Sequence, residues 1–150
     1  MHRIRTLALL AASCCAAGAA QAQSATACPQ LPVIANVQWT VQEGRDFVFC
    51  RAIEFDTQRQ AFAVAIGRAA TFKPRRGDRI GGQVRIDGHP TWWHAPRNDL
   101  TSAIVRETLL ELASGDYAHI IVRADDPTQL ARSLRQVEQL EFADVRLGGR

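Results

Sequence analysis

The side chains best suited to binding or chemistry lie close together in residues 84–94, which read VRIDGHPTWWH. This stretch holds two of the three tryptophans and two of the four histidines in the chain. An Asp-Gly pair at positions 87 and 88 favours a two-residue hairpin turn, because both central positions of a type I′ turn need a positive φ. The resulting register places Gln83 opposite Trp92 and Gly82 opposite Trp93.

Trp92 is the strongest candidate for a binding contact. Alternate residues of a strand share a face, so Trp92 lies with Arg85 and His94. Trp93 faces the other way with Val84 and is expected in the core. An exposed Trp among polar groups is a frequent hot spot of interfaces. The alternative is that a helix covers this face.

A second candidate surface is the basic loop at residues 73–79, which read KPRRGDR. Four of these residues are basic and one is acidic. Such a segment is either a solvated loop or a contact for an anion or an acidic partner. We therefore add two of its arginines to the binding hypothesis, which comprises Trp92, Arg85, His94, Arg75 and Arg76.

Patterns for catalysis or metal binding are weaker. His89 and His94 are five residues apart, so on one regular strand they point to opposite faces and cannot share a metal ion. No serine lies in a G-x-S-x-G motif, and the glycine motifs that bind phosphates are absent. We therefore expect no catalytic residue, metal or cofactor. The alternatives are a small periplasmic hydrolase that uses His94 with an acid such as Asp99, and a ligand-binding accessory domain.

The N-terminus has the pattern of a cleaved export signal. Residues 1–5 carry two arginines, residues 6–20 are apolar and rich in alanine, and residues 20–22 match the A-x-A cleavage pattern. The apolar run is too short for a comfortable membrane span, which needs about 20 apolar residues. We expect a signal peptide at 1–22 and a single α+β domain at 23–150, periplasmic or secreted by a bacterium. Lipoprotein processing at Cys14 or Cys15 is the alternative.

Composition narrows the class of partner. The chain has 18 basic and 15 acidic residues, and loss of Arg3 and Arg5 with the signal would leave the mature domain close to neutral. No basic block survives, so nucleic acid is not implied. We expect a protein or envelope component as partner and no transmembrane span in the mature chain. Cys28 and Cys50 remain as a pair in an oxidising compartment, which predicts a disulfide bond.

A sheet is needed to position these side chains. Apolar residues that alternate with polar ones are typical of strands with one buried face. This pattern predicts strands at residues 33–41, 46–55, 60–68, 80–86, 89–94 and 117–123.

The pattern changes in the C-terminal part of the chain. Val105, Leu109 and Leu112 recur at helical spacing and predict a helix over residues 103–114. An Asp-Pro pair at residues 126–127 predicts the start of a second helix, because Asp caps helices and Pro suits their first position. The predicted fold class is therefore α+β, with an antiparallel β-sheet built from hairpins, followed by two helices packed on it. No motif identifies a family.

Overall fold

The computed structural model describes residues 27–96, 102–142, 145 and 147, so the expected signal peptide lies outside the described residues. The elements, in chain order, are η1 (Val33–Ala35), β1 (Val37–Glu43), β2 (Phe47–Glu54), β3 (Gln60–Gly67), η2 (Arg76–Asp78), β4 (Arg79–Ile86), β5 (His89–His94), β6 (Ile104–Glu111), β7 (Tyr117–Ala124) and α1 (Pro127–Val137). The two η elements are short 3-10 turns.

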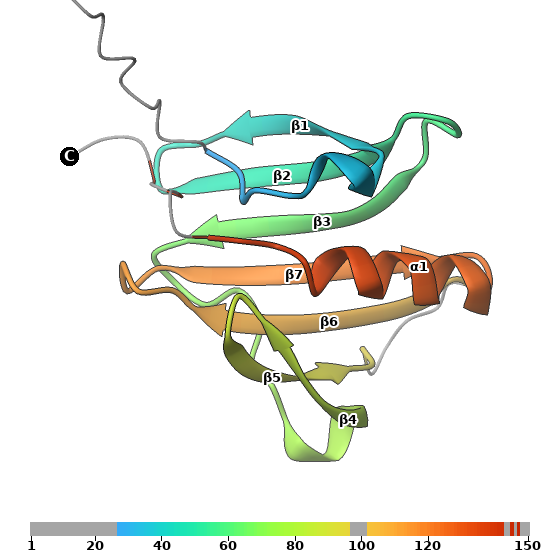
Figure 1. Ribbon diagram of the computed structural model, residues 1–150. Helices are drawn as coiled ribbons and strands as arrows, with labels where there is room; N and C mark the ends of the chain where they lie inside the picture. The colour runs from blue at the N-terminus through green and yellow to red at the C-terminus, as the bar shows by residue number, and fades with distance from the viewer. Residues whose placement is uncertain (1–26, 97–101, 143–144, 146, 148–150) are drawn as a thin grey trace, which may run out of the picture.

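The strands form one antiparallel sheet in the order β1-β2-β3-β7-β6-β5-β4. The sheet consists of two meanders, β1 to β3 and β4 to β7, which the pairing of β3 with β7 joins side by side (Figure 1). The predicted antiparallel sheet of hairpins is therefore confirmed. β5 and β6 pair at a single described position, where His94, the last residue of β5, lies opposite Glu107. The β4–β5 hairpin is therefore attached to the rest of the sheet through the end of β5.

In the described residues one α-helix is present instead of the two predicted, and this helix, α1, begins where the Asp-Pro pair predicts. The Asp126 carboxylate accepts hydrogen bonds from the backbone N–H groups of Thr128 and Gln129, at 2.7 and 2.9 Å, and Pro127 occupies the first turn. The helix packs across β3 and β7, and Figure 1 shows it in front of them. Arg132 of α1 bonds the buried carboxylate of Glu54 at 3.4 Å, which fixes the helix against β2 as well.

The predicted helix over residues 103–114 is wrong, because this segment is strand β6. Its burial follows a period of two, with Thr108, Leu110 and Leu112 buried. Ile104 and Val105 are β-branched, which favours a strand. Val105, Leu109 and Leu112 fit a helical period, whereas the even-numbered Ile104, Leu110 and Leu112 fit a strand, and pairing with β7 over the whole length of β6 decides between them.

The core lies between the sheet and the layer that contains α1. Phe62, Val64 and Ile66 of β3 turn their side chains into it, and each is at most 1% exposed. Residues 27–36 and residues 138–142 extend this layer beside the C-terminal half of the helix, where Gln30 pairs with Glu141 and Gln136 donates to the carbonyl of Ala35 (Figure 1). Residues 33–35 form η1 rather than the start of the first predicted strand.

The hairpin turn forms as its residues predict. Asp87 and Gly88 have φ values of 48° and 74°, the two positive values of a type I′ turn. The register from the turn to the Gln83–Trp92 pair is also as predicted. Beyond it the register shifts, so that Ile80 and not Gly82 lies opposite Trp93. Gly81 takes a φ of 71° in this irregularity, a conformation that glycine adopts without strain.

The predicted disulfide joins Cys28 to Cys50 and ties the N-terminal segment to β2. The two half-cystines are 22 residues apart and nearly fully buried in the core. A covalent link between them restricts the unfolded chain more than the folded one.

We expect the double variant Cys28→Ala/Cys50→Ala to lose roughly 3 kcal/mol of unfolding free energy, the size that the chain-entropy model gives for a loop of this length. Urea unfolding followed by tryptophan fluorescence measures the loss. A reductant should reproduce it in the wild-type chain and have no effect on the variant. Equal midpoints for variant and wild type would contradict the prediction.

Candidate functional site

Helix α1 covers one face of the sheet, and the face turned away from it is here called the open face. Residues that lie opposite each other in paired strands share a face, so the strand register shows which side chains lie on the open face. His94 lies opposite both Arg79 and Glu107, so these three residues share the open face. Trp92 and Arg85 belong to the same face, as the sequence predicts. Trp93 belongs to the other face and is 4% exposed, which confirms its expected place in the core.

Trp92 does not stand alone on the open face. The guanidinium carbon of Arg79 lies 4.7 Å from the centroid of the Trp92 ring, within the range of a cation–π interaction. Trp92 is half-buried under this contact. The sequence prediction places Arg85 on the same face as Trp92, and the side chain of Arg85 donates to the backbone carbonyl of Gly88 at 2.9 Å.

The loop that leads into β4 adds further positive charge beside this stack. Lys73, Arg75 and Arg76 are exposed. Within the described part of the chain, no carboxylate forms an ion pair with any of the three. We call the set on this side of the sheet the basic–aromatic surface. Its members are Lys73, Arg75, Arg76, Arg79, Arg85 and Trp92.

His94 belongs to the open face but does not reach the solvent. It is 3% exposed, and neither ring nitrogen has a hydrogen-bond partner among the described residues. The ring of Phe72 lies edge-on to it, with centroids 5.5 Å apart. His94 therefore cannot contact a partner directly, although the binding hypothesis includes it. Asp99, the acid expected to act with it in a hydrolase, lies outside the described residues.

A second histidine of the open face, His119 on β7, has a partner on each ring nitrogen. Its Nε2 lies 3.1 Å from Oε2 of Glu107 on β6, and its Nδ1 lies 3.0 Å from Oγ1 of Thr71. A carboxylate only accepts hydrogen bonds, so Nε2 carries the proton and neutral Nδ1 accepts from the threonine hydroxyl. Burial lowers the pKa of His119 below its ordinary 6.5, while the hydrogen bond and charge of Glu107 act to raise it.

Phe72 connects the two histidines and anchors the basic loop. Its ring stacks on His119 with centroids 5.1 Å apart and planes at 12°, while it meets His94 edge-on. The adjacent Thr71 bonds the same imidazole. At the other end of the loop, the N–H of Ala95 donates to the carbonyl of Asp78 at 3.0 Å. The cations between these anchors are therefore held close to the sheet.

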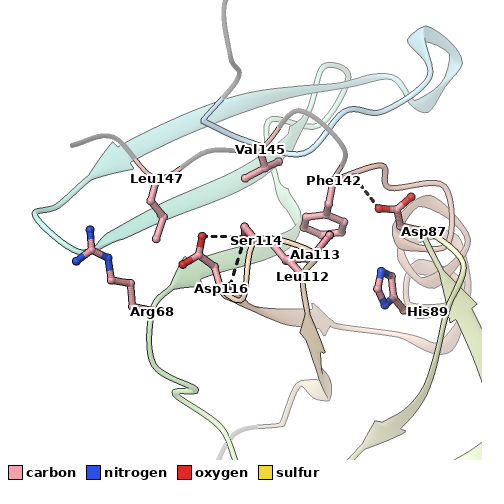
Figure 2. A pocket seen from close by; sticks show the side chains of 10 residues that line it. All are labelled: Arg68, Asp87, His89, Leu112, Ala113, Ser114, Asp116, Phe142, Val145 and Leu147. Atoms are coloured by element: carbon pink, nitrogen blue, oxygen red, sulfur yellow. Dashed lines mark hydrogen bonds between the residues drawn. The ribbon is translucent and has the colours of Figure 1, made fainter. Parts of the chain in front are cut away.

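A cavity of about 610 Å³ lies away from this surface, between the β4–β5 and β6–β7 turns and the C-terminal segment. Figure 2 shows Phe142 and Leu112 between two groups of lining residues, with Asp87 and His89 on one side and Arg68, Asp116 and Leu147 on the other. The carboxylate of Asp87 accepts from the N–H of Phe142 at 3.0 Å and holds that segment to the hairpin turn. Arg68, Asp87 and Asp116 place charges of both signs on the lining of the cavity. The residues that line it are Arg68, Asp87, His89, Leu112, Ala113, Ser114, Asp116, Phe142, Val145 and Leu147.

Neither a metal-binding cluster nor a membrane-spanning helix is found in the described ranges. No group of three or more His, Cys, Asp or Glu residues there is placed to hold a metal ion. The one helix in those ranges, α1, has 11 residues and is too short to cross a bilayer.

Comparison with known proteins adds no assignment. No family model, curated protein or solved structure matches the chain. Any proposal about function therefore depends on the residues and geometry described above.

Sequence reasoning missed the arrangement around His119. Sequence patterns gave His119 no role, because its own strand contains neither of its partners, Thr71 and Glu107. Glu107 was assigned to a helix, so no strand pairing could bring it beside a residue of β7. Thr71 and Phe72 lie in a loop whose path depends on tertiary contacts. The available signal is the parity of Glu107, which is opposite to that of the buried residues Thr108, Leu110 and Leu112 and places Glu107 on the open face if the segment is a strand.

The two adjacent tryptophans should differ in their effect on stability. We expect Trp93→Ala to cost about 3–5 kcal/mol of unfolding free energy, because it leaves a cavity in the core. Trp92→Ala should cost much less, since Trp92 is only half-buried and lies on the face that α1 does not cover. Urea unfolding of the two variants, each the control of the other, measures the difference. Equal losses would show that both faces are covered.

The pKa of His119 should respond to Glu107. We expect Glu107→Gln to lower it further, because the variant loses the carboxylate that favours the imidazolium. NMR titration of the ring signals measures the shift, and Glu111→Gln on the same strand is the control. A pKa that rises in the Glu107 variant would contradict the geometry. Because folding lowers this pKa, the unfolded chain binds the proton first, so the stability from neutral His119 should fall as the pH drops below about 6.5.

Proposed function

We propose that this chain is an exported, non-catalytic binding domain that holds an acidic protein or other anionic component of the envelope on its basic–aromatic surface. The stacking of Arg79 on Trp92 is the observation that carries the proposal. Trp and Arg are the residue types most enriched among interface hot spots. Their contact presents a flat aromatic group and a fixed positive charge to the same partner.

The charge around the stack supports an acidic partner. Lys73, Arg75 and Arg76 are exposed and have no carboxylate partner in the described ranges. Uncompensated positive charge attracts an anionic surface and raises the rate of encounter. The anchors at Phe72 and Asp78 limit the motion of the loop before binding, which reduces the entropy lost when a partner orders it.

The proposal can be tested with a defined acidic probe. We expect an Asp/Glu-rich peptide that contains one aromatic residue to shift the NMR signals of the Trp92 indole and of residues 73–79, more strongly at low salt. The double variant Arg75→Gln/Arg76→Gln should weaken binding about tenfold or more, because charge-assisted contacts of two arginines are lost.

The matched control is Arg45→Gln/Arg51→Gln, which removes the same charge from exposed positions near the opposite edge of the sheet. It should bind the peptide like the wild-type chain. Equal weakening in both double variants would mean that only net charge matters and would overturn the proposed surface. Pull-down from an envelope extract with the same variants then identifies the natural partner.

The Thr71–His119–Glu107 chain favours a second candidate function, a small hydrolase. Neutral Nδ1 of His119 accepts from the Thr71 hydroxyl, so it can take that proton when the oxygen attacks an ester carbonyl. The imidazolium would return the proton to the leaving alcohol, and water would release the acyl group. Turnover in an ester screen that disappears in both Thr71→Ala and His119→Gln, but persists in His94→Ala, would favour this function over the binding domain.

A further inference from the structure

The two edges of the sheet are built differently. At the β4 edge, the register breaks around Gly81, and Arg79 and Arg85 lie on either side of the break. Irregular pairing and positive charge are devices by which proteins prevent an edge strand from pairing with another chain. β1 has neither device. Its register with β2 is unbroken over the whole strand, and its sequence, VQWTVQE, contains no proline and no basic residue.

The hydrogen bonds that flank β1 show which of its backbone groups point outward. The N–H of Gly44 donates to the carbonyl of Phe47 at 2.8 Å, and that of Phe55 donates to the carbonyl of Asn36 at 3.1 Å. Hydrogen-bonded pairs alternate with non-hydrogen-bonded pairs along an antiparallel ladder. The even-numbered residues of β1, such as Thr40, therefore bond β2. The odd-numbered residues turn their N–H and C=O groups away from the sheet.

Exposed apolar side chains are concentrated on the same side of the molecule. Every large hydrophobic residue that is strongly exposed in the described ranges lies between positions 33 and 55. One is on β1, two are at the ends of β2, and two are in the turn before β1. In chain order these residues are Val33, Ile34, Val41, Phe47 and Phe55. The β1 side thus combines free backbone groups with apolar surface, as interfaces between copies do.

We propose that β1 pairs with β1 of a second copy of this chain, antiparallel, about a twofold axis at Thr40. The register is self-complementary, as a twofold interface requires. Trp39 of each copy lies opposite Val41 of the other, and both residues present outward backbone groups that hydrogen-bond across the axis. The Trp–Val contact is a favourable cross-strand pair, and it covers Val41, which is 45% exposed in the single chain.

Sedimentation of the oxidised exported chain over a dilution series tests the association. The wild-type chain should form a dimer that dissociates on dilution. Val41→Pro should be monomeric, because it removes an outward N–H while the ladder with β2 keeps its bonds. Val41→Thr keeps that N–H and should remain dimeric. A wild-type chain that is monomeric at every concentration, or a Val41→Pro variant that still dimerises, would overturn the proposal.

A cross-link tests the register without a proline. Thr40 of the two copies forms a non-hydrogen-bonded pair, in which Cα atoms lie about 4.5 Å apart, within the reach of a disulfide bond. Under mild oxidation, Thr40→Cys should therefore give a covalent dimer linked through position 40. Gln38→Cys, on the same strand and face, should not link to itself, because Gln38 lies opposite Gln42. Equal linking of the two variants would rule out this register.

Discussion

The pairing of β3 with β7 is the contact on which the rest of the structure depends. All other strand pairs in the described sheet join neighbours in the sequence, whereas this pair brings residues 60–67 against residues 117–124. Closing so long a segment costs conformational entropy, which burial along the join must offset. Val64 and Ile120, opposite each other in the pair, are both fully buried. Helix α1 packs across the same two strands, so its position also follows from this pair.

The open face depends on the same join. His119 lies on β7 directly opposite Ala65 of β3, whose small side chain leaves room above the sheet. Phe72 occupies that region and stacks on His119, and Thr71 bonds the same ring. The basic loop thus begins at a point fixed by the central strands. Its cations and the Arg79–Trp92 stack together form the basic–aromatic surface.

The parts of the fold that local chemistry determines could be predicted from the sequence. The type I′ turn follows from Asp87 and Gly88, and the faces of Trp92 and Trp93 follow from counting back from that turn. The cap of α1 follows from Asp126 in the same way. The pairing of Cys28 with Cys50 follows from two expectations, that Cys14 and Cys15 leave with the signal peptide and that the remaining pair meets an oxidising compartment.

What could not be predicted depends on contacts between distant segments. The apolar residues in 104–111 are compatible with a helix or a strand. The segment is a strand because it pairs with β7, and its own sequence does not show that this partner is present. Because the segment was predicted to be a helix, Glu107 was not assigned to the sheet, and its contact with His119 could not be predicted. The break at Gly81 could not be placed either, because a glycine pair marks an irregularity without fixing its size.

The join between β3 and β7 also has a consequence for the order of folding. A chain that folds from its N-terminus completes β1 to β3 while residues 68–116 still separate them from β7. During that interval the hairpins and the Cys28–Cys50 bond can form, but one edge of β3 has no partner. That edge is flanked by the apolar side chains of the future core, so it is the place where two unfinished chains would pair wrongly. Productive folding therefore depends on how quickly the second meander reaches β3.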